Sequence, residues 1–78
     1  MKPVFTVRFV TIDQVQRFVD SIRKVPYDVD ACHGNYVVDA KSLLGLLSLS
    51  LGREIELKIH SDSGVAYELL QTVCEEFK

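Results

Sequence analysis

The chain has 78 residues, and nine Lys or Arg against eleven Asp or Glu give a formal net charge of −2 at pH 7. Hydrophobic residues make up 47% of it, with four Gly and two Pro, a composition typical of one globular domain over residues 1–78 rather than of a disordered segment. Because nucleic acids and anionic membrane surfaces are bound through clustered Lys and Arg, this mildly acidic balance argues against either role.

The N-terminal residues run directly into a strand pattern and show neither the apolar core nor the small-residue cleavage site of a secretory signal. Cys32 and Cys74 are far apart in sequence and lack CxxC spacing, which favours reduced thiols over a disulfide or a metal site. We therefore expect a cytoplasmic protein that needs no cofactor or metal.

The first predicted element is a strand over Val4–Val10, where apolar and polar side chains alternate with the two-residue period of a half-buried strand. Its apolar face consists of Phe5, Val7 and Phe9.

A helix is predicted next, over Ile12–Lys24. Residues 11–14 match a capping box, in which Thr11 accepts from the Gln14 amide and the Gln14 side chain reaches back. Pro26 prevents continuation of the helix. The apolar stripe is Val15, Phe18, Val19 and Ile22.

A hairpin is predicted from Tyr27–Cys32 and Tyr36–Ala40, joined by a Gly-Asn turn of type II′ or I′. In this register Ala31 pairs with Val38, and Val29, Ala31, Val38 and Ala40 face inward. The outward residues include Asp28, Asp30 and Asp39, with Asp30 opposite Asp39. Like charges in that position are destabilising, so we expect this acidic face to be solvated, or to meet a cation or a basic partner.

Three further elements complete the chain. Ser42 is a natural N-cap for a leucine-rich helix of two to three turns, and Gly52 stands where a C-cap glycine belongs. Residues 54–60 alternate strictly, which predicts a fourth strand with Ile55, Leu57 and Ile59 inward. Asp62-Ser63-Gly64 then caps a last helix, whose apolar positions are Val65, Leu69, Leu70, Val73 and Phe77.

The element order is therefore β-α-β-β-α-β-α. It predicts an α+β fold of the open-faced β-sandwich kind, in which a four-stranded antiparallel sheet carries three helices on one face.

Catalytic motifs are absent from the sequence, which has no Gly-rich phosphate loop, HExxH or GxSxG pattern. His33 at the hairpin turn and His60 at the end of a strand are expected to be ordinary solvated histidines. We therefore do not expect an enzyme.

The leucine-rich helix offers a binding surface instead. Its leucines cover an arc of about 220°, wider than the stripe that packing on one side buries. If Leu46 and Leu49 face the core, three exposed leucines gather beside Ser42. These residues, named here the leucine patch, are Leu43, Leu44 and Leu47. Such a patch usually marks a surface for a partner or a second copy, although a loop or terminus could instead cover it.

The stretch from Lys41 to Leu49 closely resembles the regulatory helix of HPr, the histidine-containing phosphocarrier protein of the bacterial sugar phosphotransferase system. Residues 27–59 follow that family's pattern without a gap. The resemblance implies the HPr fold and a Ser42 that a regulatory kinase phosphorylates. It also implies that phosphotransferase enzymes and regulators dock on Leu43, Leu44 and Leu47 beside Lys41.

The chain departs from that family at the start of the first helix, where the family carries a G-[IL]-H-x-R-P-A segment with a phospho-accepting histidine. Here Thr11 occupies the histidine position and Asp13 the arginine position. Thr11 cannot form a phospho-imidazole, and Asp13 repels an incoming phosphoryl group. We therefore expect an HPr-like regulatory or binding module that has lost phosphotransfer. The alternative is a working phosphocarrier with a non-standard acceptor among Thr11, His33 and His60.

Overall fold

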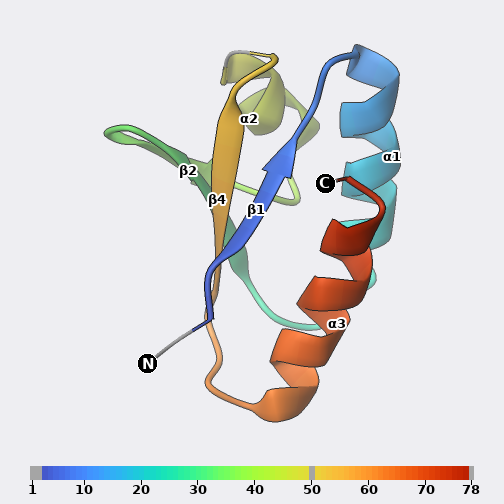
Figure 1. Cartoon of the computed structure of the whole chain (residues 1–78), viewed down its shortest axis with the longest axis vertical. Coiled ribbons are helices and arrows are strands. Elements are labelled where there is room, and N and C mark those ends of the chain that lie inside the picture. The colour runs from blue at the N-terminus through green and yellow to red at the C-terminus, as the bar shows by residue number, and fades with distance from the viewer. Residues whose placement is uncertain (1–2, 50, 78) are drawn as a thin grey trace.

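A computed structural model describes residues 3–49 and 51–77. Its elements, in chain order, are β1 (Phe5–Arg8), α1 (Ile12–Ile22), β2 (Val29–His33), β3 (Tyr36–Asp39), α2 (Leu43–Ser48), β4 (Glu54–Ile59) and α3 (Gly64–Glu75). The four strands form one antiparallel sheet in the order β1-β4-β2-β3, and the three helices lie on one face of it (Figure 1). The predicted α+β open-faced sandwich is confirmed.

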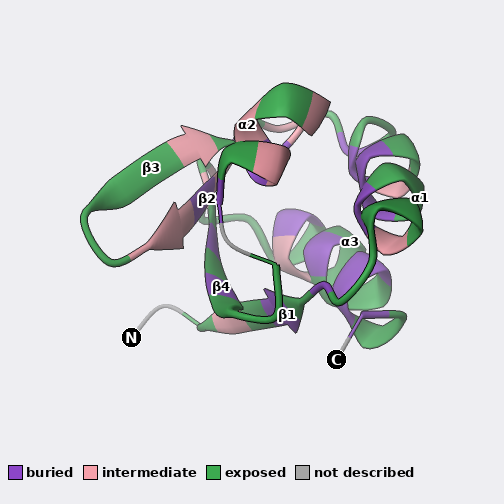
Figure 2. Ribbon diagram, turned by 90° about the horizontal axis from the view of Figure 1, so that it is seen from above, coloured by how far each residue is buried: buried purple, intermediate pink, exposed green. Residues whose placement is uncertain are grey.

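The core lies between the sheet and the helices, and the residues that form it are coloured as buried in Figure 2. Three phenylalanine rings pack together where β1 leads into α1. The ring centroids of Phe9 and Phe18 are 5.0 Å apart, and Phe77 lies 5.8 Å from the first and 5.5 Å from the second. This aromatic cluster fixes the backbone from which the first residues of α1 project. The other buried sheet residues include Val7, Val29, Ala31, Ile55 and Leu57.

The hairpin forms in the predicted register, with Ala31 opposite Val38 and Asp30 opposite Asp39. Of the two turn residues only Gly34 has a positive φ, +59°, which distinguishes a type II′ turn from type I′. Helix α1 buries its predicted stripe, although it ends at Ile22, two residues before the predicted Lys24.

The boundary predicted for the leucine-rich helix is wrong. Helix α2 has only six residues, and Leu49, with extended backbone angles, is its C-cap in place of Gly52. Gly52 has a positive φ of +83° and turns the chain towards β4, while its N–H donates to the carbonyl oxygen of Phe9 at 2.6 Å. This bond holds the loop after α2 beside the start of α1.

The apolar stripe predicted for α3 is also partly wrong. Val65 and Leu69 are exposed, and the buried positions include Ala66 and Cys74. With Leu70, Val73 and Phe77, these two residues follow the helical period, so the small side chains set the face that approaches the sheet. Within residues 3–49 and 51–77, no helix has both the length and the hydropathy needed to cross a membrane.

Candidate functional site

The first candidate position is Thr11, the N-cap of α1. Its backbone is extended, at φ −123° and ψ 157°, and its Oγ1 accepts a hydrogen bond from the backbone N–H of Gln14 at 3.2 Å. The predicted capping box is confirmed. The Thr11 hydroxyl oxygen therefore has a structural task, which is to satisfy one of the free amides in the first turn of the helix.

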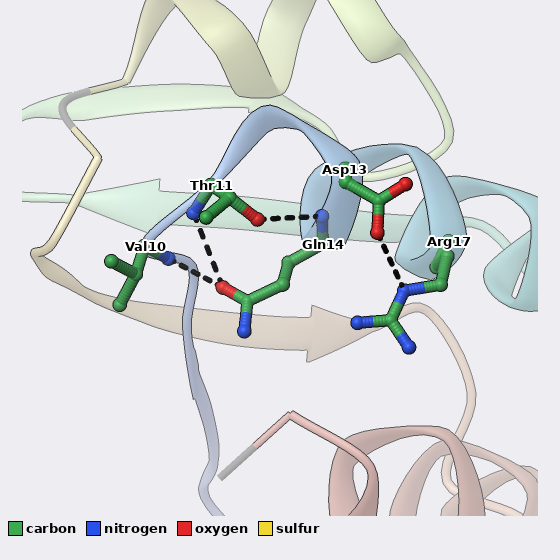
Figure 3. A network of polar contacts seen from close by, with 5 residues as sticks. All are labelled: Val10, Thr11, Asp13, Gln14 and Arg17. Carbon is green, nitrogen blue, oxygen red and sulfur yellow. Dashed lines mark hydrogen bonds and ion pairs between the residues drawn. The ribbon is translucent and has the colours of Figure 1, made fainter.

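The Gln14 side chain completes this arrangement (Figure 3). Its Oε1 accepts from the backbone N–H of Val10 at 2.7 Å and from that of Thr11 at 3.2 Å. Amides at the start of a helix can otherwise hold an anion. At α1 these two amides are instead occupied by a side chain of the same helix.

Asp13 lies on the solvent side of this turn. Its carboxylate is 3.2 Å from the Nε of Arg17 one turn later, and both side chains are largely exposed (Figure 3). A carboxylate in the first turn stabilises the helix, because the helix dipole places partial positive charge there. Arg17 is thus already paired with a carboxylate of its own helix.

The two histidines lie outside this network. The Nδ1 of His33 is 3.1 Å from the backbone carbonyl of Glu54, which can only accept, so this nitrogen carries the proton and donates. His60 is exposed, and its Nε2 lies 2.7 Å from Oδ2 of Asp30. The prediction of simply solvated histidines is therefore incomplete, since each imidazole has a partner on a neighbouring strand.

The acidic face is confirmed by the hairpin register, but its carboxylates are not all free. Besides the contact of Asp30 with His60, the Oδ1 of Asp39 accepts from the backbone N–H of Lys41 at 2.9 Å. In the pairing of β2 with β4, Lys58 lies opposite Asp30. Among the described residues, no group of three His, Cys, Asp or Glu side chains could hold a metal ion.

The second candidate position is Ser42, the N-cap of α2. Its Oγ accepts from the backbone N–H of Gly45 at 3.0 Å, which confirms the predicted cap. The space above Gly45 is tight, since a Cβ built there would lie 3.2 Å from Oγ of Ser42 and 3.2 Å from Cβ of Val38. Glycine therefore allows the helix to approach β3 and the serine closely.

The Lys41 side chain points away from Ser42. Its Nζ donates to the backbone carbonyl of Val25 at 2.6 Å, just after α1. The ammonium group of Lys41 is therefore held just after α1 rather than at the Ser42 hydroxyl. Arg23 is the cation that reaches this region, because its Nε donates to the backbone carbonyl of Lys41 at 3.3 Å.

The leucine patch is less exposed than predicted. Leu44 is 81% exposed, and Leu46 and Leu49 are buried as expected. Leu43 and Leu47 are half-buried and pack against the core, so their predicted full exposure is wrong. The reason is that α2 contacts both α1 and β3, and a short helix held on two sides buries a wider arc than one packed on a flat sheet.

Exposed apolar residues at the start of α1 were missed by the sequence analysis. Val10 is 66% exposed and Ile12 is 59% exposed. The bond from Gly52 to Phe9 brings Leu51, itself 42% exposed, beside Val10. Strand alternation gave no signal for this, because the proximity depends on a loop contact between residues far apart in sequence.

Comparison with known proteins gives matches only at the level of structure. No family model matches the chain, and no curated protein does. A crystal structure of a phosphocarrier protein HPr from Bacillus anthracis str. Ames matches with a TM-score of 0.74 and 18% identity, over 97% of this chain and 96% of that one. The crystal structure of HPr-C-His from Thermoanaerobacter tengcongensis matches with a TM-score of 0.72 and 22% identity, over 96% and 93%. The chain therefore has the HPr fold, as the resemblance implied.

Proposed function

We propose that this HPr-fold chain is a regulatory or binding module related to the sugar phosphotransferase system, that it carries no phosphoryl group, and that it acts through the surface around Ser42 and Leu44. It is not an enzyme in this proposal, and it works in the cytoplasm on protein partners, either phosphotransferase enzymes or their regulators. The observation that carries the proposal is the closed capping box at Thr11 and Gln14, where a phosphocarrier of this fold needs an open anion site.

The chemistry at Thr11 supports loss of phosphotransfer. A phosphohistidine forms through a free imidazole lone pair, whereas Thr11 offers an aliphatic hydroxyl already used as an acceptor for the Gln14 amide. Asp13 adds a negative charge to the same turn. Two like charges about 4 Å apart repel by about 1–4 kcal/mol between bulk-water and near-surface dielectric, so an incoming phosphoryl group is disfavoured.

The α2 surface has the opposite character. Its first turn contains no acidic residue, and Leu44 is the most exposed of the large hydrophobic side chains in the described part of the chain. Arg23 lies beside the backbone of Lys41, next to Ser42. A phosphate on Ser42 would have both the Arg23 guanidinium and the Asp39 carboxylate nearby, and would change the charge beside Leu44 while leaving the helix in place.

A second candidate function, a phosphocarrier with a non-standard acceptor, is favoured by one observation at His60. This imidazole is exposed, and Asp30 orients its Nε2 at 2.7 Å, an arrangement that can leave Nδ1 available as a nucleophile.

The two functions are separated by incubation with phosphotransferase enzyme I and phosphoenolpyruvate, followed by intact-mass measurement. We expect no mass gain. An acid-labile gain of one phosphate that disappears in His60→Gln and persists in His33→Gln would establish the carrier function instead. A gain that disappears in Thr11→Val and resists mild acid would identify the threonine as acceptor.

A further inference from the structure

The two edges of the sheet are protected to different degrees. At the β1 edge, the N–H of Arg8 donates to the backbone carbonyl of Phe77 at 3.2 Å, and Pro3, which has no N–H, precedes the strand. At the β3 edge only the Asp39 carbonyl is bonded in this way among the described residues, accepting from the N–H of Ser42 at 3.0 Å. Tyr36–Asp39 contains no Lys or Pro that would discourage pairing. Figure 2 shows β3 at the rim of the molecule, with much of its surface exposed.

The hairpin register fixes which backbone groups face that rim. His33 and Tyr36 flank the two-residue turn, so they form the hydrogen-bonded pair next to it. Hydrogen-bonded and non-bonded pairs alternate, so Cys32 and Val37 form a non-bonded pair. The N–H and C=O of Val37 therefore point outward from the sheet, available to another strand.

Two of the three exposed side chains along this edge, those of Tyr36 and Val37, are apolar, and the third is the carboxylate of Asp39. Tyr36 is 71% exposed on the helix face of the sheet, and Val37 is 62% exposed on the open face. Exposed aromatic and β-branched residues on a free edge are a template for strand pairing.

We infer that β3 pairs with β3 of a second copy of this chain, antiparallel about a two-fold axis at Val37, to give a continuous eight-stranded sheet. In this register Val37 lies opposite the second copy's Val37, and each donates its N–H to the other's carbonyl. Tyr36 lies opposite Val38, an aromatic and β-branched pair of the kind that stabilises antiparallel strands.

The charges of the strand favour this register over a shifted one when a second copy binds. Asp39 lies opposite the uncharged Asn35, and the two Asp39 carboxylates are four residues apart along the paired strands. At about 3.3 Å per residue this is about 13 Å, beyond the Debye length of about 8 Å at physiological ionic strength. A register shifted by one residue, centred on Val38, would bring the two carboxylates to about half that separation. The strand is thus complementary to itself in one register.

The pairing uses only a four-residue strand, so the interface is small and the dimer is expected to be weak. Sedimentation equilibrium over about 10 µM to 1 mM should show the apparent mass rising from the 8.8 kDa of the monomer towards twice that value. A wild-type chain that stays monomeric over the whole range would overturn the inference. This holds even if the β3 edge instead binds an extended segment of another protein.

The decisive test is a charge pair at residue 37. Val37→Lys and Val37→Glu each place like charges opposite one another in the dimer, so each alone should self-associate at least about tenfold more weakly. An equimolar mixture should associate again, because the introduced lysine of one copy faces the introduced glutamate of the other. Recovery in the mixture also demonstrates that both variants are folded. If the mixture stays monomeric while the wild type dimerises, the proposed register is wrong.

Leu44→Glu is the control, since Leu44 is also an exposed hydrophobic residue but lies on α2. It should leave β3 pairing unchanged. Self-association that is lost in Leu44→Glu and retained in Val37→Lys would assign the dimer to the leucine patch and contradict the inference.

Discussion

The N-termini of α1 and α2 have the same cap hydrogen bond but differ in the residues around it. Thr11 accepts from Gln14 at 3.2 Å, and Ser42 accepts from Gly45 at 3.0 Å. The residue three positions after each cap differs. Gln14 returns to cover the N–H groups of Val10 and Thr11. Gly45 has no side chain to return, and the corresponding N–H groups of Lys41 and Ser42 donate to Oδ1 and to the carbonyl oxygen of Asp39. The first turn of α1 also carries Asp13, whereas that of α2 carries no acidic residue.

The comparison shows that a capped helix start need not receive an anion. At α1 the side chains of Thr11 and Gln14 supply the acceptors and Asp13 supplies the negative charge. They stabilise the helix and occupy backbone amides that a phosphate would otherwise bind. At α2 the first turn itself carries no carboxylate, and the amides of Lys41 and Ser42 are bound by Asp39 from outside the helix. The two N-cap hydroxyls therefore make the same bond and differ in the residues around them.

The largest expected effect is at the acceptor position of α1. Thr11→His alone should still accept no phosphoryl group from enzyme I and phosphoenolpyruvate, because Asp13 and Gln14 keep the turn negative and occupied. Combining it with Asp13→Arg and Gln14→Ala removes both obstacles and should raise the intact-mass yield of phosphoprotein by at least about tenfold. Efficient transfer by the single variant would show that the closed cap is not the obstacle.

The second expected effect concerns partner binding at α2. Leu44→Glu should weaken capture of the phosphotransferase partner by at least about tenfold, since exposed anchor residues of an interface commonly contribute this much. Its free energy of unfolding should change by no more than about 0.5 kcal/mol, because the side chain is exposed. Leu47→Glu is the less clean variant, because half-burial adds a stability loss. Unchanged binding in Leu44→Glu, measured by titration calorimetry, would remove the leucine patch from the function.

The third prediction compares the two caps directly. Thr11→Ala and Ser42→Ala should each lower the free energy of unfolding by about 1 kcal/mol in urea titrations. Ser42→Asp should be nearly neutral because aspartate caps equally well, whereas Gln14→Ala should cost about 0.5–1.5 kcal/mol by freeing two amides. If Gln14→Ala has no cost, the capping box contributes nothing and the contrast between the two helix starts disappears.

The smallest expected effect is at the exposed ion pair of α1. Asp13→Asn should lower the free energy of unfolding by about 0.3–0.5 kcal/mol at low salt, through loss of the Arg17 contact and of the favourable interaction with the helix dipole. The difference from the wild type should shrink as NaCl is raised towards 1 M. Arg17→Gln is the control that breaks the pair and keeps the carboxylate. A larger, salt-independent loss would assign Asp13 a role other than this surface pair.

The fold could be predicted from the sequence because its information is local. Alternation marked the strands, the Gly-Asn pair fixed the hairpin register, and the Thr11, Ser42 and Ser63 caps marked the helix starts. The helix ends were less predictable, since Gly52 serves a contact with Phe9 rather than the end of α2. The sequence pattern of a helix C-terminus is the same whether a glycine with positive φ ends the helix or turns the loop that follows it.

The candidate site was predicted only in part. The residues at its centre, Thr11 and Ser42, have the capping roles that their spacing indicated. The exposure of Leu43 and the direction of Lys41 depended on tertiary contacts, with the core in one case and with the Val25 carbonyl in the other. A helical wheel treats the helix as packed on one side, so it could not describe a short helix held on two.

The central place of β4 also determines when this chain can fold. Because β4 pairs with both β1 and β2, β1 has no strand partner until residues 54–59 have been synthesised. The β2–β3 hairpin is local in sequence and can form early. The pairing of β1 with β4 joins residues 46 to 52 positions apart, since Arg8 lies opposite Glu54 and Phe5 opposite Leu57. Such non-local contacts slow folding, and the sheet can be completed only after residues 54–59 have been synthesised. Until then the apolar side of β1 remains exposed, and the nascent chain is at its most prone to aggregate.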